Sequence, residues 1–152
     1  MQFLYNTGAR AQEVVDVRLP ALRFDAPAQV RLIGKGQKER LCPLWRETVE
    51  LLSVMLRDRA VPLTENVHLF VNAARRPLTR FGLGHIVRTR AAAATTFRPA
   101  LAKMRITPHT FRHTTGLHLL QSGVELKWYE AGWDTQVSRL LTPTSKSISR
   151  CD

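Results

Sequence analysis

The feature that most restricts the fold of this chain is a pair of β-prone runs joined by a glycine-punctuated connection. The runs are residues 29–33 and 39–44, and the sequence between them is Gly34-Lys35-Gly36-Gln37-Lys38. Glycine adopts the positive φ angles that tight connections need, so the pattern is typical of a β-hairpin. The chain is therefore expected to contain two adjacent antiparallel strands, with Lys35 and Lys38 at or beside the hairpin tip.

Three segments outside the hairpin have the apolar spacing of helices. The first is residues 9–17, which is rich in valine and has Asn6 and Thr7 as candidate N-caps. The second is residues 45–59, where apolar side chains recur along one predicted face, and the third is residues 78–94, which ends in a run of alanines. Most of the chain is therefore expected to be helical.

A fourth helix has the clearest start and stop signals in the sequence. Thr107 is placed to cap it, and Pro108 would occupy the first helical position, where the missing N–H costs nothing. Gly123, after Ser122, is typical of the residue that ends a helix. The short apolar run over residues 67–71 would supply a third strand. The sequence thus predicts an α+β fold, mostly helical, with a small three-stranded antiparallel sheet.

The charge of the chain is strongly basic and unevenly distributed. Its 152 residues, enough for one core-forming domain, carry 23 Lys and Arg against 12 Asp and Glu, a net charge of +11. Between Asn66 and Val124 the sequence contains no Asp or Glu. The cations of that stretch are Arg75, Arg76, Arg80, Arg88, Arg90, Arg98, Lys103, Arg105 and Arg112. The alternative is a solvated arginine-rich surface, but a stretch this long favours contact with nucleic-acid phosphates.

Several other classes of protein fit the sequence poorly. Cys42 and Cys151 have no metal-ligand spacing, so neither a disulfide framework nor a metal site is predicted. No apolar stretch approaches the ~20 residues of a membrane span, and no signal peptide is recognised, so a cytoplasmic location without a membrane partner is expected. Gly34-Lys35-Gly36 lacks the spacing of a nucleotide-binding loop, which argues against ATP or another small-molecule substrate.

Two pairs of side chains are candidates for binding phosphate. His109 and Arg112 are three residues apart, so they share a face in the first turns of the predicted fourth helix, where free N–H groups already favour anions. An imidazole there would also exchange a proton. Arg10, with Glu13 one turn later to orient it, is the second candidate. The alternatives are a capped core helix for the first pair and a solvated ion pair for the second.

Three segments in the same order resemble the tyrosine recombinases, or phage integrase family. They read LYNTGARAQE over residues 4–13, GKGQKERLCPL over residues 34–44, and TPHTFRH over residues 107–113, before Leu119-Leu120 and Gly123. The resemblance covers residues 1 to about 126. It implies the catalytic domain of that family, which acts in DNA integration and recombination.

The resemblance implies a role for each matching side chain. Arg10 and Arg112 would bind the non-bridging oxygens of the scissile phosphate. His109 would hydrogen-bond the same phosphate and assist proton transfer. Lys38, which matches the family's hairpin lysine better than Lys35 does, would protonate the leaving 5′ oxygen. The family uses neither metal nor cofactor, and its partners are double-stranded DNA and further recombinase protomers on that DNA.

The sequence departs from the family at the nucleophile. A tyrosine attacks the phosphate and forms a 3′-phosphotyrosyl link in this family, following a Leu-Gly-His motif that is absent here. Tyr5 precedes Arg10 and is interpreted as a packing residue, whereas Tyr129 follows Arg112 too soon for in-line attack. We therefore expect a DNA-binding recombinase fragment that does not cleave DNA.

The two ends of the chain also differ from the family. Residues 1–126 are expected to form part of a catalytic domain, without the DNA-clamping domain that precedes it in the family, and residues 127–152 an aberrant, poorly ordered tail. Our hypothesis is that the tail is the correct gene read in the wrong frame, because residues 128–135 shifted by two bases can read Val-Val-Arg-Gly-Trp-Leu-Gly-His. The codons of the gene test this hypothesis.

Two alternatives to this function remain at the level of sequence. One is a non-catalytic basic module that binds DNA or RNA and uses the phosphate site only for affinity. The other is an active enzyme that takes a tyrosine from a partner protomer. A covalent adduct with DNA would distinguish the second alternative from the fragment that only binds.

Overall fold

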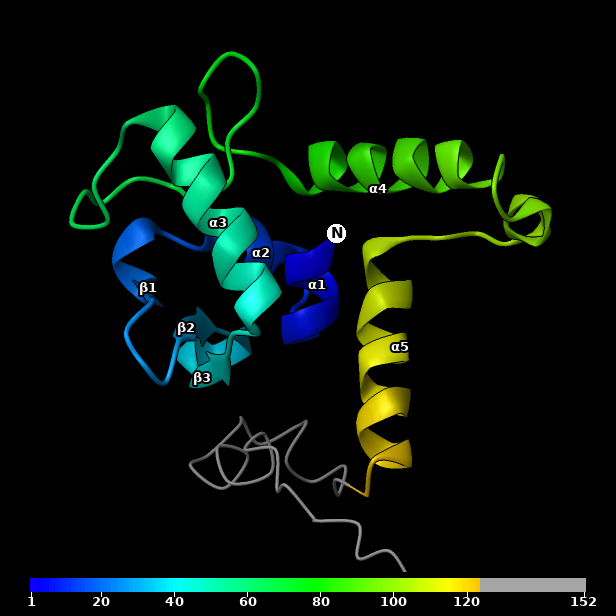
Figure 1. Cartoon of the computed structure of the whole chain (residues 1–152), viewed down its shortest axis with the longest axis horizontal. Coiled ribbons are helices and arrows are strands. Elements are labelled where there is room, and N and C mark those ends of the chain that lie inside the picture. The colour runs from blue at the N-terminus through cyan, green and yellow to red at the C-terminus, as the bar shows by residue number, and fades with distance from the viewer. Residues whose placement is uncertain (124–152) are drawn as a thin grey trace, which may run out of the picture.

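The computed structural model describes residues 1–123, so the predictions made for residues 127–152 lie outside the described residues. Within that range the chain forms five α-helices and three β-strands (Figure 1). The helices are α1 (Gln2–Thr7), α2 (Ala11–Asp16), α3 (Arg46–Arg59), α4 (Arg80–Ala94) and α5 (Pro108–Gln121). The strands are β1 (Leu22–Arg23), β2 (Gln29–Ile33) and β3 (Glu39–Pro43), and the 3-10 turns are η1 (Leu19–Ala21), η2 (Lys35–Gln37) and η3 (Pro99–Lys103).

The sheet is antiparallel with strand order β1-β2-β3, and the predicted hairpin forms its larger part. Val30 pairs with Cys42 in the middle of the hairpin, and Gly36 in the turn has a φ of 73°. The prediction of a third strand at residues 67–71 was wrong, because β1 takes that place beside β2. The backbone of the 67–71 run bonds instead to the segment after α2, where the Leu69 N–H donates to the Val17 carbonyl.

The N-terminal helices are divided differently from the sequence prediction. Asn6 and Thr7 lie inside α1 rather than capping the next helix, because Gly8 ends α1 in the left-handed conformation, with φ 55°. Asn6 Nδ2 donates to the Pro43 carbonyl at 3.1 Å, and Asn6 Oδ1 accepts from the Trp45 N–H at 2.9 Å. The buried Asn6 side chain therefore joins α1 to the junction of β3 and α3.

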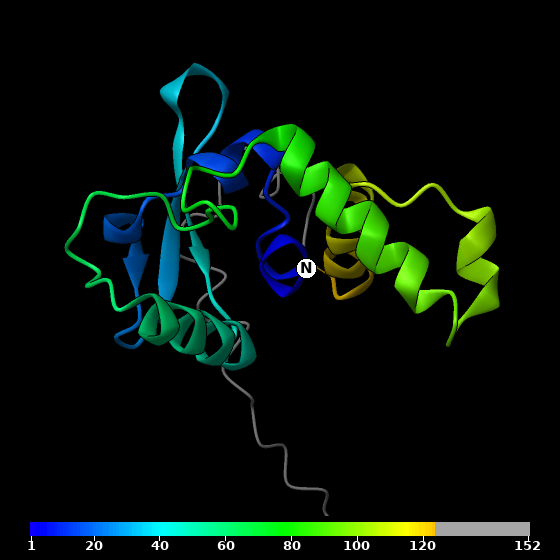
Figure 2. The same cartoon turned by 90° about the horizontal axis from the view of Figure 1, so that it is seen from above.

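α1 lies between the sheet with α3 on one side and α5 on the other, while α4 extends past the N-terminus (Figure 1, Figure 2). Leu52 and Leu56 of α3 are buried, whereas Leu51, predicted to lie on the same face, is 59% exposed. Each fully buried leucine contributes about 1.5–3 kcal/mol to the hydrophobic stabilisation. The largest fully buried aliphatic side chains are Val14, Leu19, Val30, Leu32, Leu69 and Val87. No helix within residues 1–123 is long and apolar enough to cross a membrane.

α5 is attached to α1 by polar and ring contacts. Thr115 Oγ1 donates to the Tyr5 carbonyl at 2.6 Å, and the Tyr5 hydroxyl bonds to His118 Nδ1. The Tyr5 ring also packs edge-on against the rings of Trp45 and His118. These contacts agree with the interpretation of Tyr5 as a packing residue, and they fix the position of α5.

The start of α5 leads to a stability prediction. Thr107 Oγ1 accepts from the Thr110 N–H at 3.4 Å, and the Thr107 N–H donates to Thr110 Oγ1 at 3.1 Å. Thr107→Ala is expected to lower the free energy of unfolding by about 1 kcal/mol, because an N-cap acceptor is lost. Urea denaturation measures the change. Thr107→Ser keeps the hydroxyl and serves as the control, and equal midpoints for the alanine and serine variants would contradict the cap.

Candidate functional site

Arg10 lies at the N-cap of α2 and points its guanidinium toward solvent. Its side chain is 56% exposed, while that of Glu13 is 4% exposed. The Glu13 carboxylate accepts from the Arg10 backbone N–H at 2.8 Å and from Arg10 Nη1 at 3.1 Å. Glu13 thus caps the helix and orients the arginine at the same time. These two hydrogen bonds are the contacts through which Glu13 could orient Arg10, as the sequence predicts.

His109 and Arg112 occupy the first turns of α5, as the sequence predicted. His109 is exposed, and its ring contacts that of His113 edge-on, with centroids 4.1 Å apart. Arg112 Nη1 donates to the Gly8 carbonyl at 2.7 Å. Because Gly8 is the left-handed residue between α1 and α2, this bond brings Arg112 close to Arg10 although the two are far apart in the sequence.

Arg10, His109 and Arg112 line one cavity of about 300 Å³. A fourth basic side chain, Arg80 from the first turn of α4, also lines it. We did not single out Arg80 from the sequence, where its only signal was its place at a predicted helix start in the basic half of the chain. The other lining residues are Ala9, Ala11, Gln12 and Pro108.

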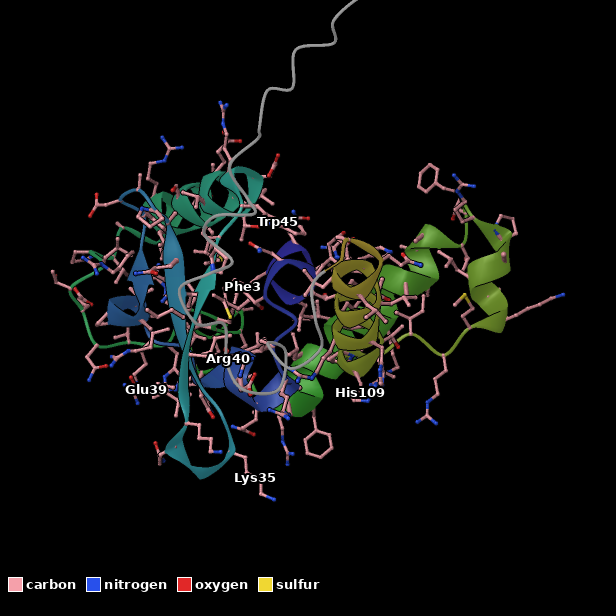
Figure 3. The ribbon with its side chains drawn as sticks, turned by 90° about the horizontal axis from the view of Figure 1, so that it is seen from below. Phe3, Lys35, Glu39, Arg40, Trp45 and His109 are labelled. Carbon is pink, nitrogen blue, oxygen red and sulfur yellow. The ribbon has the colours of Figure 1, made fainter. Side chains whose placement is uncertain are left out.

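Lys38 is not among the residues that line this cavity. It is exposed and follows the η2 turn, where the Gly34 N–H donates to the Lys38 carbonyl at 2.8 Å. Lys35 lines a neighbouring cavity of about 530 Å³, which Arg10 also lines. Figure 3 shows Lys35 at the far end of the hairpin, away from His109 on α5. The structure therefore brings three of the four predicted site residues together and leaves Lys38 apart.

Glu13, which contacts Arg10, also forms a buried ion pair with Arg40. Arg40 of β3 donates from Nη1 to Glu13 Oε1 at 3.0 Å and from Nη2 to Glu13 Oε2, and its side chain is 10% exposed. Burial by itself raises the pKa of Glu13, but the hydrogen bonds from Arg40 and Arg10 outweigh it and lower the pKa below its ordinary value. Glu13 is thus a carboxylate at neutral pH. Arg40 had no assigned role in the sequence analysis.

Cys42 lies beside this ion pair in the interior of the domain. Burial raises the pKa of its thiol to about 11, although Arg40 acts in the opposite direction. At pH 8 only about one thiol in a thousand would be ionised, so we expect iodoacetamide to leave Cys42 unmodified until the protein unfolds. Mass spectrometry of the peptide that contains Cys42, before and after denaturation, measures this. Rapid labelling of the folded protein would show that the thiol is accessible.

The chemistry of the cavity is that of an anion site. Three arginines and one histidine surround it, and none of its lining residues is acidic. Guanidinium groups pair with phosphate through forked hydrogen bonds, and an imidazole N–H can donate a further hydrogen bond. Within residues 1–123 no group of three or more His, Cys, Asp or Glu side chains could hold a metal ion. The arrangement therefore fits an anionic ligand.

Comparisons with known sequences find a matching family and similar proteins. A family model described as the phage integrase family matches residues 1–131. The tyrosine recombinase XerD of Chlorobaculum tepidum is 35% identical over 130 residues, 84% of this chain and 40% of the relative. XerD of Staphylococcus aureus (strain Mu50) is 30% identical over 156 aligned positions, 99% of this chain and 50% of the relative. The chain thus spans about half the length of these curated relatives or somewhat less.

Solved structures share the fold at lower sequence identity. A crystal structure of the XerA recombinase has a TM-score of 0.73 and 23% identity, with 91% of this chain and 49% of that chain covered. The XerH site-specific recombinase bound to palindromic difH substrate has a TM-score of 0.71 and 23% identity, with 91% and 39% covered. The predicted mostly helical domain with a three-stranded antiparallel sheet is confirmed by the fold and by these likenesses.

Proposed function

The chain belongs to the phage integrase family, and from that premise we propose that it binds double-stranded DNA through one phosphodiester in the cavity between α2 and α5. The observation that carries this proposal is the convergence of Arg10, His109 and Arg112 on a single cavity from two separate helices. A site that holds one phosphate needs several hydrogen-bond donors directed at the same place. On a surface that is only basic, the positive side chains could be spread apart.

Each side chain has a distinct part in the proposed site. Arg10 and Arg112 bind the non-bridging oxygens of the phosphate and offset their negative charge. His109 donates a hydrogen bond to the same phosphate and exchanges a proton. Arg80 adds a further positive charge at the same cavity. Lys38, which is exposed on the hairpin and does not line the cavity, is proposed to contact the DNA beside the bound phosphodiester.

We further propose that this chain holds DNA without cutting it. Tyr5 does not line the cavity: its hydroxyl bonds to His118 Nδ1 further along α5, and its ring packs against Trp45. Tyr129, the other tyrosine of the sequence, lies outside the described residues. Residues 1–126 are accordingly proposed as a catalytic-domain portion, and other recombinase protomers on the same DNA as its partners.

Fluorescence anisotropy with a labelled duplex tests the binding. Affinity is expected to fall steeply with salt, since each phosphate that the protein neutralises adds about 0.9 to the slope of log K against log salt. An affinity that does not depend on salt would contradict a phosphate site.

A suicide DNA substrate, nicked so that a cleaved product cannot be rejoined, tests the second proposal. Denaturing gel electrophoresis is expected to show no covalent protein–DNA adduct, because no tyrosine among residues 1–123 lines the cavity. A tyrosine-linked adduct formed by this chain would contradict the proposed loss of cleavage, while leaving the proposed DNA binding intact.

A further inference from the structure

One carboxylate, that of Glu13, receives four hydrogen bonds from two arginines. Two come from the backbone N–H and Nη1 of Arg10, and two from the Nη groups of Arg40. Glu13 and Arg40 are almost fully buried, whereas Arg10 is more than half exposed. The network therefore has a buried charged pair at its base and one exposed cation that faces the cavity.

The contact between Glu13 and Arg10 presents a conflict for a phosphate site. A carboxylate within about 3 Å of Arg10 orients the guanidinium, but it also offsets the positive charge that would attract phosphate. If Glu13 had no other cation nearby, the Arg10–Glu13 pair would be neutral overall. With Arg40 included, the three side chains carry a net charge of +1, and the exposed member of the group is Arg10.

Arg40 is the better placed of the two cations to hold the carboxylate. It contacts both oxygens of Glu13 with its two terminal nitrogens, the forked geometry in which arginine binds carboxylates most strongly. Arg10 contacts Oε1 through a single side-chain nitrogen at 3.1 Å. Since Arg40 is desolvated and Arg10 is solvated, the Arg40–Glu13 attraction is also the less screened.

Resting on the proposed function, we propose that Arg40 is a positioning residue that holds the charge of Glu13, so that Arg10 is oriented by this carboxylate yet keeps its positive charge for a DNA phosphate. Arg40 does not line the cavity, so it acts through Glu13 rather than on the DNA.

The backbone beside the Arg40–Glu13 pair has a glycine where there is little room for a side chain. Gly34, at the end of β2, lies so near that a Cβ there would be 3.3 Å from Glu13 Oε1 and 3.6 Å from Arg40 Nη1. A side chain at this position would be in close steric contact with the Glu13 carboxylate. The same network joins the hairpin, from which Arg40 comes, to the start of α2, so the hairpin and Arg10 are held in one arrangement.

The experiment measures duplex binding by the whole chain, by anisotropy over a range of salt concentrations. The variants are Arg40→Gln, the same change combined with Glu13→Gln, and the same change in an Arg10→Ala background. The matched control is the exposed pair Arg46–Glu50 on α3, which lines neither cavity. Arg46→Gln, with and without Glu50→Gln, changes the net charge by the same amounts.

Arg40→Gln is expected to weaken binding by about tenfold and to lower the salt slope by about 0.9, since Glu13 then neutralises Arg10. Adding Glu13→Gln is expected to restore the affinity to within about threefold of the original chain, because Arg10 regains its charge. In the Arg10→Ala background, Arg40→Gln should weaken duplex binding by less than about twofold. The control changes should each stay below about threefold.

A loss of affinity that persists in the Arg10→Ala background, or an unchanged salt slope, would overturn the proposal and assign Arg40 a purely structural role. Far-UV circular dichroism confirms that each variant is folded at the temperature of measurement. If Arg40→Gln does not fold, Arg40→Met takes its place in every comparison, because methionine also removes the charge and keeps an apolar side chain of similar length at this site. If the original chain itself shows no salt-dependent binding, the proposed function fails, and that result is distinct from either outcome for Arg40.

Discussion

Replacing Arg112 with alanine is expected to weaken the binding of a DNA duplex by about tenfold to a hundredfold, the range for an arginine that makes a forked contact with its target. Arg112 lines the cavity together with Arg10 and His109, and its Nη1 is bonded to the Gly8 carbonyl between α1 and α2. The substitution removes both a ligand for the phosphate and one of the contacts that hold α5 beside the junction of α1 and α2.

The control for this prediction is Arg75→Ala. Arg75 is exposed in the loop before α4 and lines neither of the two cavities, yet it carries the same charge in the same acid-free half of the chain. Its loss should weaken binding by less than about threefold through long-range electrostatics alone. Anisotropy titrations at one salt concentration compare the two variants. Equal effects would indicate a diffuse basic surface instead of a phosphate site.

Arg112→Lys separates charge from geometry at the same position. Lysine keeps the positive charge but cannot make the forked contacts of a guanidinium, so its affinity should fall between those of the original chain and the alanine variant. Far-UV circular dichroism of all three proteins checks that α5 remains folded.

Glu13→Ala is expected to lower the free energy of unfolding by about 3–5 kcal/mol, the cost of removing one partner from a buried ion pair. The change leaves Arg40 desolvated without its carboxylate and also removes the group that accepts from the Arg10 N–H. Urea denaturation followed by tryptophan fluorescence measures it. A loss below about 1 kcal/mol would mean that the pair is effectively solvated.

Glu39→Ala is the matched control on the same sheet. Glu39 pairs with Arg31 across the hairpin, and the two side chains are 53% and 49% exposed. Exposed pairs of this kind contribute about 0–1 kcal/mol, because water already solvates both charges. The difference between the two alanine variants therefore measures what burial and the bond to the Arg10 N–H add at Glu13.

The same pair makes stability depend on pH in a definite direction. The pKa of Glu13 is lower in the folded protein than its ordinary value of 4.5, because hydrogen bonds from the arginines favour the carboxylate. Its contribution to stability is therefore complete above that ordinary pKa and is lost as the pH falls through the lower, folded value. Glu13→Gln should show a smaller loss of stability over this acidic range than the original chain does.

Local signals in the sequence were enough to predict the elements that carry the site. The glycines around Lys35 specified the hairpin of β2 and β3, and Thr107-Pro108 specified the start of α5. The spacing of His109 and Arg112 then placed both side chains on one turn. These features depend on backbone preferences and on neighbours within four residues, which the order of amino acids states directly.

The roles of the site residues came from the family resemblance rather than from such local signals. Three separated motifs, around Arg10, Lys38 and His109, identified the family, and a family model matching residues 1–131 confirms it. The resemblance could not say which of these side chains share a cavity in this chain.

Only the tertiary structure decided which distant groups meet. In the folded chain the third strand is formed by residues 22–23 and not by residues 67–71. Arg80 lines the cavity and Lys38 does not. Arg40 forms an ion pair with Glu13. The sequence by itself determined the hairpin, the start of α5 and the positive charge, because each follows from short-range geometry or from composition. The partners of buried charges and strand edges are selected among residues far apart in the chain, by desolvation and backbone hydrogen bonding that exist only after it has folded.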